Sequence, residues 1–293
     1  MKKVFYYKNE LTDDFAGTDI KRKPLPENHK YFTKNPVWHF FAFLFYRIIA
    51  TPIGSLFNLI AYRMRIVGKG KLRKYSKEGY FLYGNHTLIP GDAFTPTMVA
   101  FPKKSHIIVN PDATSVPVIG KVVEMMGAVP IPDDIKNMRA FCKAMDEYAE
   151  RNKVVVIYPE AHIWPYYTKI RPFSDVSFKY PAKTNKPVFC FTMVYKKGKL
   201  LPILTTTVYV DGPFLPNPEL SLKENQKKLR EEVLTVMSER SKLSTFEKNE
   251  YVKVIDEFEP AAKRSENTKP EHKNVYAEPA PTEDFSDVPA QTA

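Results

Sequence analysis

A histidine and an aspartate lie six positions apart, directly after a run that is typical of a buried strand. His86 belongs to Asn85-His86-Thr87, and Asp92 follows a Pro-Gly pair. A histidine titrates near neutral pH, so it can accept a proton from a hydroxyl group. A carboxylate bound to the other ring nitrogen would fix the tautomer and stabilise the imidazolium that forms. These residue types therefore predict a general base with an orienting partner.

The spacing of this pair requires a turn. Six residues of an α-helix advance about 600°, so His86 and Asp92 would not share a helical face. Pro90-Gly91 supplies a turn that can bring them together. We expect Asp92 to open the following helix as its N-cap. The alternative is that His86 only lies in a turn and Asp92 only caps.

A second polar cluster ends another strand-like run, Val154–Tyr158. It reads Pro159-Glu160-Ala161-His162. Open α/β sheets bind ligands at the carboxyl ends of their strands. Glu160 is therefore a candidate site residue, whereas for His162 the role of a structural, hydrogen-bonded histidine is favoured over that of a second base.

Charge and cysteine content narrow the class of protein. The chain of 293 residues has a formal net charge of +11, and because residues 260–293 carry −2, the remainder carries +13. Such a basic body favours an anionic partner, which could be a membrane surface, a nucleic acid or a phosphorylated substrate. Cys142 and Cys190 are too few for a disulfide framework or a zinc finger. No signal peptide is expected, since residues 7–10 end the first apolar run early.

The run from Pro36 to Tyr62 favours the membrane among these partners. It is aromatic and aliphatic, but Arg47 and the Pro52/Gly54 pair divide it into two pieces. Each piece is shorter than the roughly 20 apolar residues that a spanning helix needs. We therefore predict a helical hairpin in the headgroup region, with adjoining cations against anionic lipid: Arg63, Arg65, Lys69, Lys71, Arg73 and Lys74. The alternative is a buried hairpin of a soluble core.

The rest of the chain alternates short apolar runs with helical stretches, which indicates an α/β fold. The expected strands are 80–83, 106–109, 128–131, 154–158, 187–195 and 203–210, and the expected helices are 92–100, 116–126, 134–151 and 222–243. The predicted organisation is an irregular arm (1–35), the membrane-associated helical hairpin (36–65), the main domain (66–259) and a disordered tail (260–293), which is rich in Pro, Glu, Lys and Ala.

These motifs resemble, in their order along residues 36–211, those of the glycerolipid acyltransferase family typified by lysophosphatidate acyltransferase. The family has Asn-His-x4-Asp after a strand, a Gly-x5-Arg block, a Phe-Pro-Glu-Gly-Thr-Arg block and a later Pro-containing strand. His86 and Asp92 match the first block, Gly127 begins the second, and Pro159-Glu160 match the third. Pro187-Val188 falls at the fourth. The resemblance implies a mixed sheet flanked by helices, as in glycerol-3-phosphate acyltransferase.

The chain departs from the family pattern in three places, and two of them concern the acceptor. Five residues separate His86 from Asp92 instead of four, Pro132-Asp133-Asp134 replaces the second-block arginine, and Glu160-Ala161-His162 replaces Glu-Gly-Thr-Arg. The family arginines are expected to bind the acceptor phosphate. Arg139, Lys169 or Arg171 could substitute, since arginine binds phosphate through forked donors. Each could equally be a surface charge.

The resemblance implies transfer of a fatty acyl group from an acyl thioester to a hydroxyl of a lysophospholipid, with 1-acyl-glycerol-3-phosphate as the first candidate. His86 and Asp92 would be catalytic, and Glu160 would bind the acceptor or order the site. The residues expected to bind substrate are Asn85, Thr87, Glu160, His162, Lys169 and Arg171. Backbone N–H groups at the helix start near Asp92 would stabilise the oxyanion.

No metal or cofactor is expected, with acyl-CoA or acyl carrier protein as co-substrate, and the expected location is the cytoplasmic face of the cell membrane, monotopic. The alternatives are a metal-dependent hydrolase, because histidines and carboxylates are also metal ligands, and a non-catalytic lipid-binding protein at the membrane surface. Nucleic-acid binding is disfavoured, because the cations adjoin an apolar hairpin and match no nucleic-acid motif.

Overall fold

A seven-stranded mixed sheet forms the centre of the computed structural model, which describes residues 2–17, 23–27, 29–116, 118–198 and 204–254. The strand order is β2-β8-β7-β3-β6-β4-β5. Neighbouring strands are parallel, except that β7 and β8 are antiparallel. The predicted α/β class with a mixed sheet is therefore confirmed. The strands are β2 (Arg65–Val67), β3 (Tyr80–Gly84), β4 (Ser105–Val109), β5 (Ala128–Pro130), β6 (Val154–Ile157), β7 (Val188–Lys197) and β8 (Leu204–Phe214).

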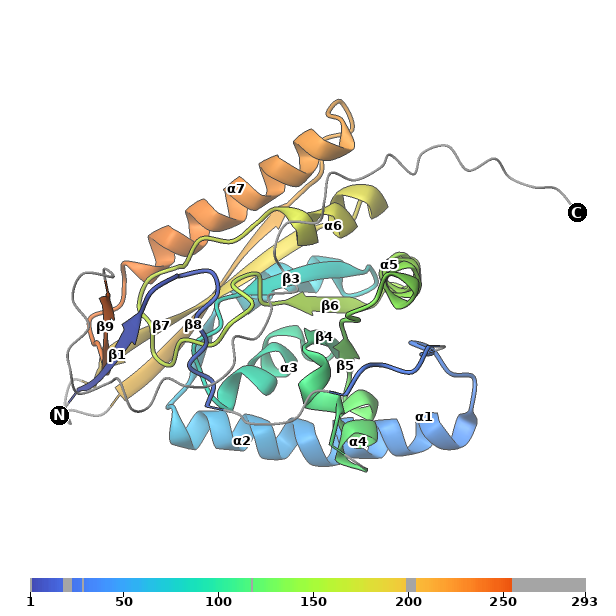
Figure 1. Ribbon diagram of the computed structural model, residues 1–293, viewed down its shortest axis with the longest axis horizontal. Helices are drawn as coiled ribbons and strands as arrows, with labels where there is room; N and C mark the ends of the chain where they lie inside the picture. Colours follow the sequence, from blue (N-terminus) through green and yellow to red (C-terminus); the bar gives the residue numbers. More distant parts are fainter. Residues whose placement is uncertain (1, 18–22, 28, 117, 199–203, 255–293) are drawn as a thin grey trace, which may run out of the picture. The chain divides into compact units, whose positions relative to one another are not determined.

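Helices cover both faces of this sheet (Figure 1). The α-helices and one π-helical segment are α1 (Pro36–Phe43), the π-helical segment η1 (Leu44–Ala50), α2 (Thr51–Ala61), α3 (Thr95–Ala100), α4 (Ile119–Met125), α5 (Ile135–Glu150), α6 (Lys179–Thr184) and α7 (Leu222–Ser241). Short 3₁₀ turns complete them: η2 (Lys69–Tyr75), η3 (Gly91–Ala93), η4 (Pro111–Thr114) and η5 (Val176–Phe178). The sequence missed β2, the 3₁₀ turns and α6, and α3 and α4 are shorter than expected.

Strand β3 shows why the central strands are apolar throughout. Phe81 and Tyr83 join the core that includes α5 and α7, whereas Tyr80 and Leu82 join the core that includes α3. Successive strand side chains point to opposite faces, so a strand covered on both faces has no polar positions. The carboxyl end of β3 consequently delivers residue 85 onward to the edge of the sheet from a rigid base.

The predicted turn between two hairpin helices is wrong, because residues 36–61 are helical without interruption. Pro52 lies in the first turn of α2, directly after η1. A proline inside an α-helix removes one hydrogen bond and crowds the preceding turn. The wider turns of a π-helix relieve that crowding. Pro36–Ala61 is thus one helix, long and apolar enough by length and composition to cross a membrane.

The π-helical segment also keeps one side of this helix buried. Ala42, Tyr46, Gly54 and Asn58 are its buried residues. Eight α-helical residues advance about 800°, which would turn Gly54 about 80° away from Tyr46. A π-helix advances less per residue, so both residues face the domain. The opposite side of the helix remains exposed and apolar.

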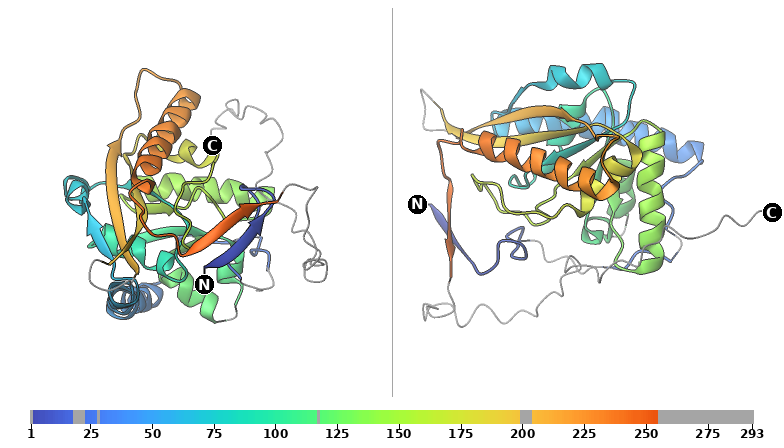
Figure 2. Two further views of the ribbon diagram at one scale, coloured as in Figure 1. Left: turned by 90° about the vertical axis from the view of Figure 1, so that its left-hand side faces the viewer. Right: turned by 90° about the horizontal axis from the view of Figure 1, so that it is seen from above.

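The N-terminal arm is not wholly irregular, which corrects the prediction. Its strand β1 (Lys3–Tyr7) pairs in parallel with β9 (Asn249–Lys253), and the two lie side by side in Figure 2. The rings of Phe5 and Trp164 both stack on Tyr251, at 5.1 and 4.9 Å between centroids. This pairing joins segments some 245 residues apart, so local sequence could not indicate it. The described residues up to Val254 form one compact unit, and the predicted tail lies outside the described residues.

Candidate active site

His86 and Asp92 meet at the carboxyl end of β3. His86 Nδ1 lies 2.7 Å from Asp92 Oδ2, and the His86 side chain keeps 18% of its surface exposed. No described residue hydrogen-bonds to Nε2, so the second ring nitrogen is available to a substrate. The sequence predicted this contact, and the turn at Pro90-Gly91 accommodates the additional residue between the two side chains.

Asp92 does not cap a helix, which corrects its expected local role. It lies within the 3₁₀ turn η3, and the helix that follows starts at Thr95. Asp92 Oδ2 accepts the backbone N–H of Leu88 at 2.9 Å, while the Asp92 N–H donates to the Leu88 carbonyl at 2.7 Å. The carboxylate therefore folds back over its own turn, and this orientation points it at His86.

Burial shapes the electrostatics of this pair. The Asp92 side chain is 5% exposed, and burial raises the pKa of its carboxyl above the usual value, although the hydrogen bond to His86 opposes the rise. Tyr158 stacks on the imidazole at 4.3 Å between ring centroids and donates its hydroxyl to the Asp92 carbonyl oxygen at 2.6 Å. Sequence reasoning missed this tyrosine, whose only signal was its place between a strand and Pro159-Glu160.

Glu160 supports the backbone of the site. It is 3% exposed, and its two oxygens accept the backbone N–H groups of His86 at 3.0 Å and Arg171 at 2.8 Å. Of its two predicted roles, these contacts favour ordering the site over contacting the acceptor. A side chain with both oxygens engaged this way fixes the start of the histidine loop.

Arg171 is not placed to bind an acceptor phosphate, because it is 1% exposed. Its guanidinium lies 3.7 Å from Glu160 and donates to the carbonyl oxygens of Glu10 and His162. Burial lowers the pKa of Arg171, opposed by the charge of Glu160. The expected phosphate contact at this position is therefore corrected to a structural ion pair.

Asn85 and Thr87 are also structural, contrary to the prediction that they bind substrate. Each is 1% exposed. The Asn85 amide exchanges two hydrogen bonds with the backbone of Met193, at 2.8 and 3.3 Å. The Thr87 hydroxyl lies 2.7 Å from the hydroxyl of Tyr195. These bonds tie the loop that carries His86 to β7.

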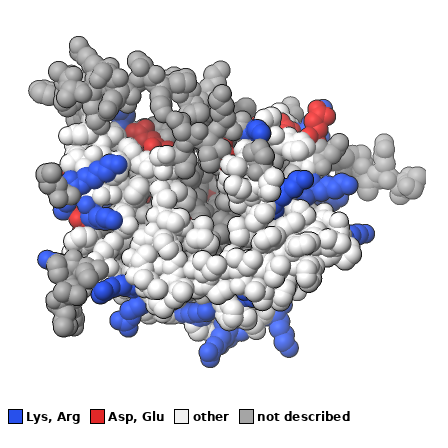
Figure 3. Space-filling view, turned by 90° about the horizontal axis from the view of Figure 1, so that it is seen from below, with Lys and Arg blue, Asp and Glu red and all other residues white. Residues whose placement is uncertain are grey.

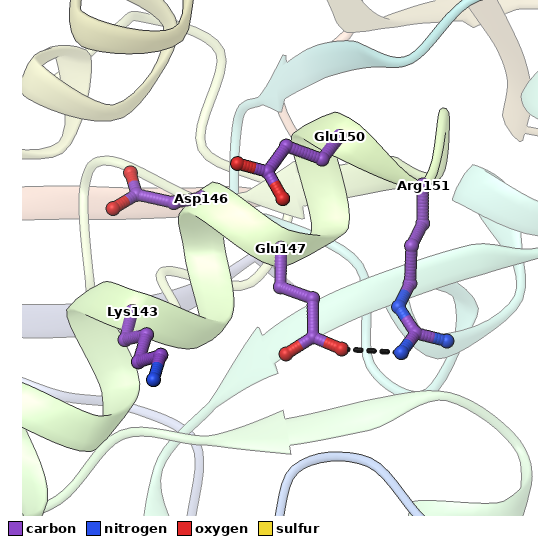
Figure 4. A pocket seen from close by; sticks show the side chains of 5 residues that line it. All are labelled: Lys143, Asp146, Glu147, Glu150 and Arg151. Carbon is purple, nitrogen blue, oxygen red and sulfur yellow. Dashed lines mark ion pairs between the residues drawn. The ribbon is translucent and has the colours of Figure 1, made fainter. Parts of the chain in front are cut away.

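The remaining candidate residues are the second histidine and two cations. His162 Nδ1 is 3.7 Å from Asp14 of the N-terminal arm. Lys169 is exposed and lines a surface hollow with Lys2 and Lys242, so its role in substrate binding stays a prediction. Arg139 lies on the exposed side of α5. A further hollow on α5 contains none of the candidate site residues (Figure 4); Lys143, Asp146, Glu147, Glu150 and Arg151 line it.

The backbone N–H groups expected to form an oxyanion hole are already used. Those of Asp92, Ala93 and Phe94 donate to the carbonyl oxygens of Leu88, Pro90 and Gly91. A donor engaged in its own turn is not free for a developing oxyanion, so this expectation is wrong for these three groups. Their role is to shape the turn.

The described residues contain no group of three or more His, Cys, Asp or Glu side chains that could hold a metal ion. The metal-hydrolase alternative therefore lacks a ligand set in this part of the chain. What the geometry offers instead is a histidine with one nitrogen held by a carboxylate and the other free.

Residues 63–196, which include the whole of this constellation from His86 to Arg171, match the model of the family described as Acyltransferase. This part of the chain belongs to the acyltransferase family. The resemblance drawn from the motifs is confirmed at that level. No curated protein matches the sequence. Among solved structures, the 1-acyl-sn-glycerophosphate (LPA) acyltransferase PlsC of Thermotoga maritima is similar, with 16% identity and a TM-score of 0.49 over 70% of this chain and 87% of that one.

Proposed function

We propose that this acyltransferase moves a fatty acyl group from an acyl thioester to a hydroxyl of a lysophospholipid at a membrane surface. The observation that carries the proposal is the 2.7 Å contact between His86 Nδ1 and Asp92, inside the region matched by the acyltransferase family. The donor would be acyl-CoA or acyl carrier protein, and 1-acyl-glycerol-3-phosphate is the first acceptor to test.

The proposed reaction needs one base and no acyl-enzyme. As the acceptor oxygen attacks the thioester carbonyl carbon, His86 Nε2 removes the hydroxyl proton, and Asp92 stabilises the resulting imidazolium. Collapse of the tetrahedral intermediate breaks the C–S bond, and the thiolate leaves and takes up the proton. Thioester and hydroxyl can react directly when both are held in position.

The exposed side of the long helix supports a membrane location. Figure 3 shows a broad face without charge, with Lys and Arg at its edges. The helix contributes large exposed apolar side chains: Val37, Phe40, Phe41, Phe43, Ile48, Ile49, Ile53, Leu56, Phe57, Leu59 and Ile60. Interfacial helices bind by burying such a face among lipid headgroups and acyl chains.

The cations beside this face divide into two groups. Arg63, Arg65, Arg73 and Lys74 are exposed and suited to anionic lipid. Lys71, by contrast, pairs with Asp211 at 2.7 Å, and Lys69 donates to the Met98 carbonyl at 2.8 Å. The electrostatic attraction to lipid would therefore come from the arginines and Lys74.

The buried side of the helix supports a monotopic arrangement. The Tyr46 hydroxyl donates to Thr97 at 3.2 Å and accepts from the Ser105 backbone at 2.9 Å. A helix that crosses a bilayer would have lipid or another helix around its middle, whereas this one has the domain along its length. We infer that it lies in one leaflet, on the cytoplasmic face.

The test is thiol release from a series of acyl thioesters by membranes that contain the wild type or His86→Ala, with and without lysophospholipids. We expect release that requires an acceptor and is lost in His86→Ala. Because Arg171 is buried, neutral and zwitterionic lysolipids belong in the series beside 1-acyl-glycerol-3-phosphate. A wild type that binds vesicles but releases no thiol with any acceptor would favour the non-catalytic lipid-binding alternative.

A further inference from the structure

The long apolar helix carries one fully buried polar side chain, Asn58, whose exposure is 0%. Its amide nitrogen donates to the Gly91 carbonyl oxygen at 3.3 Å and to the Thr95 hydroxyl at 3.2 Å. The Thr95 hydroxyl in turn donates to the same carbonyl oxygen at 2.9 Å. Three groups from the helix, the turn and α3 thus form one small network.

The amide oxygen of Asn58 argues against a role in stability alone. Its Oδ1 is buried and has no hydrogen-bond partner among the described residues. A buried polar atom without a partner costs free energy, and an apolar residue of the same shape would avoid that cost. Leucine, which has the same branched arrangement of side-chain heavy atoms, would also match the apolar character of the helix.

The network acts on the residue immediately before the catalytic carboxylate. Gly91 precedes Asp92, and the helix touches this turn a second time through Tyr62, whose hydroxyl donates to the Ile89 carbonyl at 2.8 Å. A Cβ at Gly91 would lie 2.5 Å from Leu88 and 3.1 Å from the Tyr62 ring, so a side chain there would displace these neighbours. The turn is therefore packed directly against the helix.

We infer that Asn58 is a positioning residue, which holds the Gly91 carbonyl so that Asp92 meets His86. The inference rests on the proposed function and deepens it, because it makes the lipid-facing helix part of the catalytic support. A displacement of a catalytic group by about 1 Å can lower the rate about 100-fold, so a hydrogen bond that fixes this turn can affect the reaction rate strongly. Thr95 belongs to the same hydrogen-bond network and should have the same role.

The kinetic test compares Asn58→Leu with Ser55→Ala, which changes a half-buried polar residue three positions earlier on the helix. For Asn58→Leu we expect kcat to fall about 10- to 100-fold with KM, vesicle binding and Tm unchanged, or with Tm raised. Thr95→Val should lower kcat in the same way, and the double variant should lose less than the product of the two losses. Ser55→Ala should behave as the wild type.

A second readout does not depend on activity. The Nδ1–H proton of His86 should give a downfield NMR signal, assigned by its absence in His86→Ala. We expect this signal to shift or disappear in Asn58→Leu and to persist in Leu56→Asn, which alters only the exposed side of the helix. An unchanged signal with unchanged kcat in Asn58→Leu overturns the inference. So does a kcat loss that merely follows lower Tm and weaker vesicle binding.

The proposed function and the positioning role of Asn58 can be refuted independently of each other. If the wild type transfers no acyl group to any acceptor, the proposed function fails, and the proton signal alone then decides the positioning role. A signal that is the same in Asn58→Leu and wild type would overturn that role. A signal altered in Asn58→Leu but not in Leu56→Asn would support it.

Discussion

Replacing Asp92 by asparagine should leave the His86 tautomer intact. Asp92 Oδ2 accepts two donors, His86 Nδ1 and the backbone N–H of Leu88, at 2.7 and 2.9 Å. A backbone N–H can only donate, so it selects the amide oxygen of the asparagine for this position. That oxygen then remains available to the His86 Nδ1–H. The variant consequently loses the negative charge but keeps the orientation of the ring.

The size of the loss follows from that difference. A hydrogen bond to a charged group contributes about 1.5–3 kcal/mol, against about 0.5–1.5 kcal/mol for a neutral one. The transition state, with its imidazolium, should therefore lose about 1–2 kcal/mol, or about 5- to 30-fold in kcat. A carboxylate replacement that inverts the tautomer costs about 10⁴-fold in a serine protease triad. Asp92→Ala, which removes both acceptor contacts, should be clearly worse than Asp92→Asn.

The assay is thioester-dependent transfer at saturating donor and acceptor, with His86→Ala as the baseline. The expected order of kcat is wild type, Asp92→Asn, Asp92→Ala and His86→Ala. If Asp92→Asn is as inactive as His86→Ala, the Leu88 N–H does not select the amide orientation, and the predicted His86 tautomer is wrong. If Asp92→Asn equals the wild type, the charge has no part in the reaction.

Three further outcomes concern stability. Burial raises the pKa of Asp92, so its ionised form opposes folding at pH values above the unfolded-state pKa of about 4. Asp92→Asn should therefore have a higher Tm than the wild type at pH 7, and the difference should shrink toward pH 4. A lower Tm of the variant at pH 7 would contradict this. Arg171→Met should lower the free energy of unfolding in urea denaturation by about 3–5 kcal/mol, because it leaves the Glu160 carboxylate buried without its cationic partner. Unchanged stability would argue against the pair. Gly54→Ala should cost about 1–3 kcal/mol, since its Cβ would lie 2.2 Å from the Phe94 ring, whereas Ser55→Ala should denature at the same urea concentration as the wild type.

Local patterns predicted much of this protein. The apolar runs placed six of the seven strands of the main sheet and the long helices α5 and α7 within a few residues, because hydrophobic periodicity and chain breakers act over short distances. The histidine and aspartate were also identifiable, since a turn signal between two chemically matched residues is a local feature. Their 2.7 Å contact follows that expectation.

The sequence did not indicate which polar side chains near the site are buried. Arg171 had the chemistry of a phosphate ligand, but its exposure of 1% and its contact with Glu160 depend on how the N-terminal arm packs over the loop. Asn85 and Thr87 are next to His86 in sequence, yet both face β7. Side-chain direction is a property of the packed sheet, so position beside His86 did not decide their roles.

Local sequence was enough to predict the alternation of strands and helices, the apolar character of the Pro36–Ala61 segment and the presence of a histidine–carboxylate pair after a strand. Three features became visible only in the folded chain: Pro36–Ala61 is one continuous helix, β1 pairs with β9, and Asn58 reaches the turn before Asp92. The difference lies in the sequence separation of the interacting residues, because turn chemistry and periodicity are set by near neighbours in the chain. A π-helical adjustment, a strand pairing or a buried amide depends on residues that only folding brings into contact.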